Sequence, residues 1–459
     1  MGFCDTVAAL STPFGKGGIA VIRISGEDAV AVAEKVFFPK NQKKLSGCEV
    51  GRMTYGEIRL DKEPIDDGMA VIFRAPRSFT GEDTVEISCH GGIFVTQKVL
   101  TAILSSGARA AEAGEFTRRA FVNGKLGLGR AEALGTLLEA ANDEQLRISH
   151  GALGGRMERR CAQIYAKLRS TLAQIYAAVD YPEEDLADMT PAEMKEALLL
   201  SLEEINSLAD TYKTGHAIVE GVKTVICGKT NVGKSTLYNR LVGREAAIVT
   251  ELEGTTRDLL DETVSLGRVT LRLFDTAGIR ETEDRVEKLG VERAMETLDS
   301  AELILAVFDG SRPLDDKDRV ILDNIKDKKC PKLAVINKND ENSMINKNAF
   351  DGIFDVTVRI SAKNGENIDE LCRAVELLYI NEEIDTASDA VVINARQNAA
   401  LRKASSHVAL AIDALDAGES PDLAGVDVEL AMAALSEIDG REVGEDVVSE
   451  IFSHFCVGK

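Results

Sequence analysis

The stretch at residues 228–235 has the residue types and the spacing of a phosphate-binding loop. It reads Gly-Lys-Thr-Asn-Val-Gly-Lys-Ser, which matches the pattern G-x-x-x-x-G-K-S. Its glycines permit backbone conformations that a Cβ would forbid, so amide N–H groups can point at a bound phosphate. In this pattern Lys234 reaches the β- and γ-phosphates, and the hydroxyl of Ser235 is a ligand of Mg²⁺. A glycine-rich turn without a ligand is the alternative that the pattern alone leaves open.

Two later motifs could complete the phosphate end of such a site. Residues 254–258 (Gly-Thr-Thr-Arg-Asp) stand where a switch loop carries a threonine that binds Mg²⁺. Residues 275–278 (Asp-Thr-Ala-Gly) follow a stretch that we expect to be a strand. Asp275 can hold Mg²⁺ through water, and the amide of Gly278 can meet the γ-phosphate.

Two more motifs would recognise the base. Residues 337–340 (Asn-Lys-Asn-Asp) follow another apolar run, and the Asp340 carboxylate can accept from both N1–H and the 2-amino group of guanine. Adenine offers no such pair of donors. Residues 361–363 (Ser-Ala-Lys) follow the last apolar run and can support the base with a backbone amide. The five motifs in this order predict a site for GTP or GDP.

The position after residues 275–278 lacks the usual water-orienting group. Many GTPases have a glutamine there, but this chain has Ile279, whose side chain makes no hydrogen bonds. Asn231 supplies a side-chain oxygen beside the phosphates, and a monovalent cation held by it could stabilise the transition state in place of an arginine. A turn-stabilising role for Asn231 is an alternative of at least equal weight at this point.

Length and charge limit the classes of protein that fit this sequence. A chain of 459 residues is too long for one hydrophobic core, so we expect several domains. The formal charge of −22 argues against nonspecific coating of nucleic acid, which needs a basic surface. Eight scattered cysteines without a C-x-x-C pair are typical of reduced thiols in a cytoplasmic protein. There is no apolar run of about 18 residues and no signal-peptide pattern at the start, so no membrane association is expected.

The elements that must position the five motifs alternate between strand and helix. Near-continuous apolar runs are typical of a parallel sheet covered by helices on both faces. The predicted strands are residues 222–227, 269–274, 303–308, 332–336 and 356–360. We therefore predict a doubly wound P-loop GTPase domain for this block.

Helical stretches precede and follow the block. Apolar residues at helical spacing indicate three helices. The three stripes are Ile164, Leu168, Leu172 and Ile175; Leu198, Leu202, Ile205 and Leu208; and Leu401, Val408, Ile412 and Leu415. Thr190, Pro191 and Glu193 predict a capped helix start, and residues 418–421 predict a turn before a last helix that includes residues 428–435. We expect the two helical halves to pack together as an all-α bundle around the inserted block.

The first part of the chain has the pattern of a small α/β domain. We expect strands at residues 18–25, 69–74 and 84–88 and a helix at 93–104. Arg118, Arg119 and Lys125 form a basic cluster, interpreted as a solvated helix face, with a phosphate or carboxylate site as the alternative. The predicted domains are an N-terminal α/β domain at 1–122, helical parts at 123–217 and 383–459, and a Ras-like GTPase domain at 218–382.

Several motifs outside the phosphate loop resemble those of the MnmE (TrmE) family of tRNA-modification GTPases. They are residues 17–26 (Gly-Gly-Ile-Ala-Val-Ile-Arg-Ile-Ser-Gly), 81–86 (Gly-Glu-Asp-Thr-Val-Glu), 90–92 (His-Gly-Gly) and 455–459 (Phe-Cys-Val-Gly-Lys). The resemblance covers essentially the whole chain and includes the insertion of the GTPase domain into a helical domain. Thr230, where this family commonly has proline, is a small departure.

The resemblance implies a cytoplasmic homodimer joined through folate-binding N-terminal domains. It also implies a heterotetramer with the NADH-using protein MnmG (GidA), which alone carries FAD. This complex adds an aminomethyl or carboxymethylaminomethyl group to C5 of the wobble uridine of tRNA, and a tetrahydrofolate derivative (5-formyl or 5,10-methylene) donates the one-carbon unit. The positions that match the family's folate residues are Arg23, Glu86, Lys125 and Lys459. A folate contact by Lys459 requires the chain end to fold back toward the N-terminal domain.

GTP hydrolysis in this family depends on K⁺ and on dimerisation of the GTPase domains, so the resemblance implies both here. The K⁺ ligands match Asn231, Thr250, Leu252 and Thr255, and the Mg²⁺ ligands match Ser235 and Thr256. Glu287 matches the water-positioning acid and joins Asn231 and Lys234 as a predicted catalytic residue. For Cys456, in the terminal motif, a nucleophilic role and a buried structural thiol are both open. The predicted GTP contacts are Asn231, Val232, Gly233, Lys234, Ser235, Thr236, Thr250, Glu251, Leu252, Glu253, Gly254, Thr255, Thr256, Asp275, Thr276, Ala277, Gly278, Asn337, Lys338, Asp340, Ser361, Ala362 and Lys363.

The main alternative function is a ribosome-assembly GTPase switch of the Era kind, which shares the five motifs and the missing glutamine. A protein of that kind carries a basic RNA-reading module, and this acidic chain shows none. A scaffold with a degenerate nucleotide pocket is disfavoured by the intact Lys234, Ser235, Asp275 and Asp340.

Overall fold

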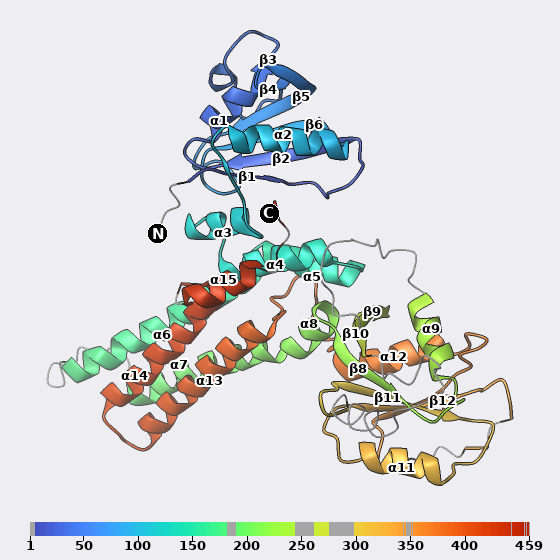
Figure 1. The fold of residues 1–459 in the computed structure, drawn as a ribbon. Helices are drawn as coiled ribbons and strands as arrows, with labels where there is room; N and C mark the ends of the chain where they lie inside the picture. The colour runs from blue at the N-terminus through green and yellow to red at the C-terminus, as the bar shows by residue number, and fades with distance from the viewer. Residues whose placement is uncertain are drawn as a thin grey trace. The chain divides into compact units, whose positions relative to one another are not determined.

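The chain forms two compact units, one made of residues 1–135 together with 436–459 and the other of residues 136–435 (Figure 1). The computed structural model describes residues 5–180, 190–243, 261–274, 298–342, 344–345, 350, 352–441, 443–453, 455 and 457–458. Among the helices it describes, none has the length and apolar character needed to cross a membrane. The division into four parts made from the sequence stays a prediction.

The first unit is built on a seven-stranded sheet in the order β3-β4-β5-β6-β2-β1-β7, with only β1 and β7 parallel. Its strands are β1 (Val7–Leu10), β2 (Ile19–Ser25), β3 (Phe37–Pro39), β4 (Thr54–Leu60), β5 (Glu63–Phe73), β6 (Thr84–His90) and β7 (Arg109–Ala110). The helices of this part of the chain are α1 (Ala29–Val36), the 3-10 helix η1 (Leu45–Gly47), α2 (Ile93–Ser105), α3 (Glu115–Val122), α4 (Leu128–Glu139) and α15 (Glu445–Ser453). The three strands and the helix predicted for this region are confirmed, and four further strands complete the sheet.

Alternation along β2 separates the two faces of this sheet. Ile22 and Ile24 are fully buried in the core that includes residues of α1 and α2. Arg23, between them, belongs to the opposite face because successive strand side chains alternate. Glu86 in β6 is its direct cross-strand neighbour. The fold therefore places two predicted folate residues together on the face away from α1 and α2.

Arg119 in α3 shows that the predicted solvated helix face is wrong at this position. Its side chain is 0% exposed and pairs with three carboxylates, those of Asp5 at 2.6 Å, Glu115 at 2.9 Å and Glu82 at 3.2 Å. A buried cation needs such partners because it loses its hydration in the protein interior. The three acids come from separate segments, so Arg119 joins α3 to the N-terminal segment and to the loop before β6. Lys125 is exposed.

The end of the chain lies against the N-terminal domain. The hydroxyl of Ser11 donates to the carbonyl oxygen of Gly458 at 3.0 Å, and Val457 forms a β-bridge with Ala113. Gly458 has a φ of +99°, and a Cβ there would lie 2.0 Å from the carbonyl oxygen of Leu10. The expected return of the chain end is thus confirmed for residues 457–458.

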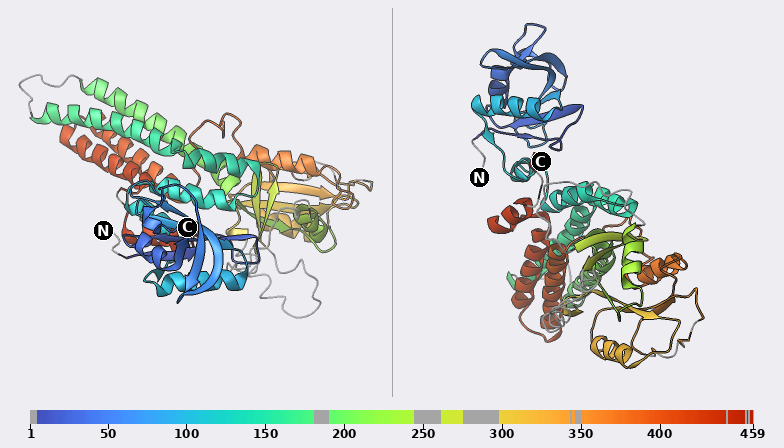
Figure 2. Two further views of the ribbon diagram at one scale, coloured as in Figure 1. Left: turned by 90° about the horizontal axis from the view of Figure 1, so that it is seen from above. Right: turned by 45° about the vertical axis from the view of Figure 1, so that its right-hand side comes forward.

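The helical part of the second unit brings distant segments of the chain side by side. Its helices are α5 (Asp143–Leu153), α6 (Arg156–Asp180), α7 (Pro191–Asp210), α8 (Tyr212–Val219), α13 (Ala395–Asp416) and α14 (Pro421–Asp439). Helix α7 lies along α13, with ion pairs between Lys195 and Asp416 and between Asp210 and Arg402 (Figure 2). The packing of the two helical halves is therefore confirmed, as is the capping box at the start of α7. Helix α14 begins earlier than predicted, at Pro421, because proline is well suited to the first helical turn.

The rest of the second unit is a six-stranded sheet in the order β13-β12-β11-β8-β10-β9. Its strands are β8 (Val222–Cys227), β9 (Asp261–Leu266), β10 (Val269–Phe274), β11 (Leu303–Asp309), β12 (Lys332–Asn337) and β13 (Val356–Arg359), and its helices are α9 (Lys234–Gly243), α11 (Asp316–Ile325) and α12 (Ile368–Tyr379). The five predicted strands are confirmed, and they are parallel to one another. Strand β9, which the sequence analysis missed, is an antiparallel edge.

Gln145 in α5 anchors strand β10 to the helices. Its Nε2 donates to the carbonyl oxygen of Ile218 and to the hydroxyl oxygen of Thr270, both at 3.0 Å. The Thr270 hydroxyl also donates to Ile218 at 2.8 Å. This buried triangle fixes β10 beside α8 at the end of the strand opposite to Phe274.

Candidate functional site

The phosphate loop joins β8 to α9, and two of its glycines have backbone conformations that other residues rarely adopt. Gly228 has a φ of +146° and Gly233 a φ of +98°. A Cβ on Gly228 would lie 2.4 Å from the carbonyl oxygen of Val307, and one on Gly233 would lie 2.1 Å from Nδ2 of Asn337. Both positions therefore require glycine, as the sequence pattern predicted.

Lys234, the first residue of α9, directs its ammonium back into this loop. The ammonium donates to the carbonyl oxygens of Gly228 at 2.7 Å and of Lys229 at 2.6 Å. Burial lowers the pKa of Lys234 because the charged form loses hydration there. A phosphate oxygen would supply the full negative charge that the two carbonyl dipoles replace only in part. Ser235 and Thr236 follow in the exposed first turn of α9.

Asn231 lies at an exposed position of the loop in the left-handed conformation, with a φ of +65°. Asparagine adopts this conformation more readily than most residues do. The backbone therefore supports the turn-forming role that the sequence left open. The exposed side chain keeps its oxygen accessible, so the cation role is compatible with this geometry and stays a prediction.

Asn337 joins the base-recognition motif to the phosphate loop. Its Nδ2 donates to the carbonyl oxygen of Val232 at 2.8 Å, and its Oδ1 accepts from the amide of Ala362 at 2.9 Å. All three residues are almost completely buried. One side chain thus positions three of the predicted nucleotide motifs relative to one another, so this part of the site is preorganised. The sequence predicted a GTP contact for Asn337 but did not reveal this cross-link.

Asp309 at the end of β11 is a site residue that the sequence analysis missed. Its carboxylate pairs with the ammonium of Lys338 at 2.7 Å and accepts from the hydroxyl of Ser311 at 2.6 Å. Burial acts to raise the pKa of Asp309, but these hydrogen bonds outweigh burial and hold the pKa at about 2. Lys338 is therefore held by an anion that stays charged at neutral pH. The only sequence signal was an aspartate directly after an apolar run.

Asp340, the predicted guanine ligand, is exposed. The pKa of Asp340 lies below its ordinary value, chiefly because the Ser361 side chain hydrogen-bonds to it. Ser361 is fully buried, and Lys363, two residues further on, is exposed. The structure thus brings Asp340 and residues 361–363 together, with a charged carboxylate available to accept two N–H groups.

Lys229 connects the phosphate loop to α11. Its ammonium pairs with the carboxylates of Asp315 and, at 3.3 Å, Asp318. These two aspartates also form the capping box at the start of α11. Lys229 occupies a position that the motif leaves unspecified, so its anchoring role was not predicted.

The other predicted nucleotide, metal and chain-end residues lie outside the part of the chain that the structure describes. They are Thr250, Glu251, Leu252, Glu253, Gly254, Thr255, Thr256, Asp275, Thr276, Ala277, Gly278, Glu287, Cys456 and Lys459. Strand β9 begins at Asp261, shortly after the first switch motif, and β10 ends at Phe274, directly before the second. The two strands therefore lie between the two switch motifs in the sequence. Within the described residues, no group of three or more His, Cys, Asp or Glu side chains could hold a metal ion.

Two predicted folate residues form an ion pair on the face of the first sheet that is opposite to α1 and α2. Arg23 donates to one carboxylate oxygen of Glu86 from Nε at 2.9 Å and from Nη2 at 2.8 Å. The guanidinium also lies over the rings of Phe79 and Phe116, at 5.2 and 5.6 Å from the ring centroids. Aromatic rings beside a cation and a carboxylate suit a heterocycle that carries N–H groups and an anionic tail.

Lys125 reaches the same region from the segment after α3. Its ammonium donates to the carbonyl oxygen of Pro76 at 2.9 Å, in the loop that also carries Phe79. The structure thus collects Arg23, Glu86 and Lys125 around one loop, although they are far apart in the sequence.

Comparisons with known proteins agree over the whole chain. The family model described as GTP-binding protein TrmE N-terminus matches residues 6–125, and the MnmE helical domain model matches residues 128–456. The tRNA modification GTPase MnmE of Clostridioides difficile (strain 630) is 39% identical, and that of Lachnoclostridium phytofermentans 40% identical, each over 99% of both chains. The G domain of the T. maritima FeoB iron transporter is 21% identical with a TM-score of 0.26, covering 34% of this chain and 98% of that one.

Proposed function

The chain belongs to the MnmE family of tRNA modification GTPases, and from this membership we propose that it is the GTP-hydrolysing subunit of a tRNA-modifying complex. The proposed reaction adds an aminomethyl or carboxymethylaminomethyl group to C5 of the wobble uridine, with a tetrahydrofolate derivative as the one-carbon donor. The observation that carries the GTPase half of the proposal is the cross-link that Asn337 makes between the phosphate loop and the base motif.

The described residues fit a guanine nucleotide. The loop amides and the ammonium of Lys234 would hold the phosphates, since Lys234 can exchange its two carbonyl partners for phosphate oxygens. The charged carboxylate of Asp340 would accept from guanine. Mg²⁺, held by Ser235 and Thr256, would neutralise charge on the β- and γ-phosphates. The exposed hydroxyl of Ser235 is a ligand type that suits this ion.

We further propose that K⁺ replaces an arginine as the charge that stabilises phosphoryl transfer. The support is the exposed amide of Asn231 in the loop and the absence of a hydrogen-bonding group at Ile279. Dimerisation of two GTPase domains would complete this site. Its ligands would be Asn231, Thr250, Leu252 and Thr255, and Glu287 would position the attacking water.

The folate donor would bind in the first unit. Arg23, Glu86 and Lys125 supply two cations and one carboxylate around a loop with an aromatic residue. The returned chain end would add Lys459, the residue after Gly458. The complete complex would be a cytoplasmic homodimer, joined through the N-terminal domains, with the FAD-carrying partner MnmG.

The GTPase half of the proposal is tested by turnover in KCl and in NaCl at equal ionic strength. The wild-type protein should hydrolyse GTP much faster in KCl, and Asn231→Ala should remove this difference. Asn239→Ala, an exposed asparagine in α9, serves as the matched control and should keep it. Equal wild-type rates in the two salts would contradict the cation site. Nucleoside analysis of tRNA from cells lacking the protein tests the other half, with loss of the modified wobble uridine as the expected result.

A further inference from the structure

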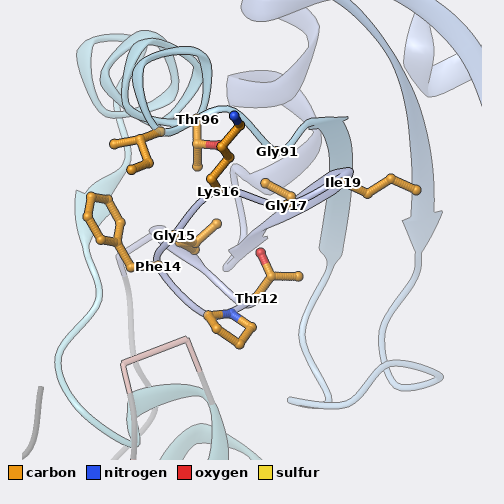
Figure 3. Close-up of a pocket in the computed structure, with 12 residues that line it drawn as sticks. Thr12, Phe14, Gly15, Lys16, Gly17, Ile19, Gly91 and Thr96 are labelled. Atoms are coloured by element: carbon orange, nitrogen blue, oxygen red, sulfur yellow. The ribbon is translucent and has the colours of Figure 1, made fainter. Parts of the chain in front are cut away.

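A cavity of about 290 Å³ in the first unit has no role in the function proposed above (Figure 3). It is formed by the loop between β1 and β2 and by the start of α2. Its size is at the lower end of the range of roughly 300–1,000 Å³ that small-molecule pockets span. Ala20 lines it and belongs to the core face of β2, whereas Arg23 and Glu86 lie on the opposite face. The cavity is therefore separate from Arg23 and Glu86, two of the predicted folate residues.

The cavity favours a negatively charged occupant. Among the described residues that line it, Lys16 is the only charged one and none is acidic, although the chain as a whole carries a net charge of −22. Lys16 is exposed, and within the described residues no hydrogen bond or ion pair engages its ammonium. Ile93 and Thr96 place the first turn of α2 at the cavity, and no side chain caps this helix start. Its free N–H groups add positive partial charge to that of Lys16.

Several side chains that line the cavity are apolar, and one of them is aromatic. Phe14 is 66% exposed and Ile19 is 69% exposed, which is unusual for such large hydrophobic side chains. Figure 3 shows Phe14 and Ile19 on opposite sides of Lys16, which extends from the loop toward α2. An exposed ring beside an exposed cation matches a planar aromatic group that carries an anion.

Nothing inside the protein would prevent a side chain at the three glycines of this loop. A Cβ on Gly15 or Gly18 would meet nothing within 4 Å, and one on Gly17 would make only an ordinary contact at 3.7 Å. None of the three has a positive φ. Gly91 on the other side of the cavity differs, because a Cβ there would lie 2.6 Å from the carbonyl oxygen of Gly17. The empty space beside Gly15, which lines the cavity, lets an external group approach the backbone closely.

We propose that this cavity binds an unstacked nucleotide of the tRNA, with its base against Phe14 and its phosphate at Lys16 and the start of α2. The inference rests on the proposed tRNA-modification function. Bases of single-stranded loops are recognised by splaying them out and stacking them on aromatic side chains, and a base must leave its stack before an enzyme can act on it. Stacking also lets an acidic protein bind RNA with few basic residues. A reduced folate shares this ring-plus-anion chemistry, so it forms a separate arm of the test.

The test measures binding of an anticodon stem–loop RNA, with uridine at the wobble position, to the full-length protein by fluorescence anisotropy. Gly15→Ala should leave the melting temperature unchanged or slightly raised, since its Cβ would meet nothing within 4 Å, yet weaken RNA binding by filling the cavity. Phe14→Ala should weaken binding roughly 5- to 150-fold through lost stacking. Lys16→Gln should reduce the slope of log K against log salt by about 0.7. Tyr55→Ala and Lys43→Gln, exposed positions outside the cavity, are the matched controls.

The outcomes separate this inference from the function on which it rests. Wild-type RNA affinity in all three cavity variants would overturn the cavity assignment while leaving the GTPase and the tRNA modification in place. Failure of the wild-type protein to bind the RNA at all would overturn both the cavity assignment and the proposed role in tRNA modification. Variants that change 5-formyltetrahydrofolate binding but not RNA binding would identify a folate as the occupant. Variants that only weaken self-association in sedimentation would identify a second copy of the chain, and either result overturns the proposal.

Discussion

Replacing Asn337 by alanine removes the side chain that connects the phosphate loop to the base motif. The carbonyl oxygen of Val232 and the amide of Ala362 would lose their partners at 2.8 and 2.9 Å, and both residues are 0% exposed. A buried polar group left without a partner costs about 1–3 kcal/mol, so the two together should lower the free energy of unfolding by about 2–6 kcal/mol. This is a large part of the roughly 5–15 kcal/mol that stabilises a domain.

The effect on binding separates a positioning role from a direct contact. Calorimetric affinities for GTP, ATP and guanosine give the contributions of the base and of the phosphates separately. With Asn337→Ala both contributions should fall, because both loops lose the same anchor. Asn337→Asp keeps the acceptor for the Ala362 amide but places a carboxylate oxygen against the carbonyl oxygen of Val232, and the two oxygens repel. The phosphate contribution alone should therefore fall. Asn364 is exposed in the segment that contains Ala362, and Asn364→Ala should change neither the base contribution nor the phosphate contribution.

One result would refute this reasoning. If Asn337→Ala lowered the preference for guanine while the phosphate contribution and the unfolding free energy stayed at wild-type values, Asn337 would act only as a base contact. The hydrogen bond to Val232 would then position nothing.

Two further predictions concern charges. Arg119→Ala should lower the free energy of unfolding, measured with urea, by about 3–5 kcal/mol because it removes the fully buried cation that pairs with Asp5, Glu82 and Glu115, whereas exposed Arg77→Ala should change it by less than about 0.5 kcal/mol. Burial acts to raise the pKa of Glu115, but hydrogen bonds from Arg109 and others outweigh burial, so the pKa of Glu115 is below the ordinary 4.5. The stability that Glu115 contributes is present above pH 4.5 and is lost as the pH falls through the lowered pKa. Arg119→Ala should diminish this pH dependence. Asp340→Asn should shift nucleotide preference from GTP toward XTP, and an unchanged ratio of the two affinities would contradict its role as the guanine ligand.

Elements with a strong local pattern could be predicted, and elements without one could not. The central strands β8, β11 and β12 of the GTPase domain were found because they are mostly apolar and largely buried. Strand β9 was missed because Asp-Glu-Thr-Val-Ser-Leu alternates polar and apolar residues, as an edge strand does. The solvated-face interpretation failed at Arg119 because two of its acid partners, Asp5 and Glu82, come from other segments. Local charge alone does not reveal such burial.

The sequence by itself determined the features that depend on neighbours along the chain. Gly228 and Gly233 require positive φ and Lys234 turns its ammonium back into the loop, because a strand, a tight turn and a helix follow one another directly. Tertiary structure decided the contacts between distant segments. Asn337 reaches Val232, 105 residues away, only because β8, β11 and β12 are adjacent parallel strands whose carboxyl ends meet at one edge of the sheet. The cavity beside Gly15 likewise exists only where the loop after β1 meets α2, since no local pattern encodes empty space.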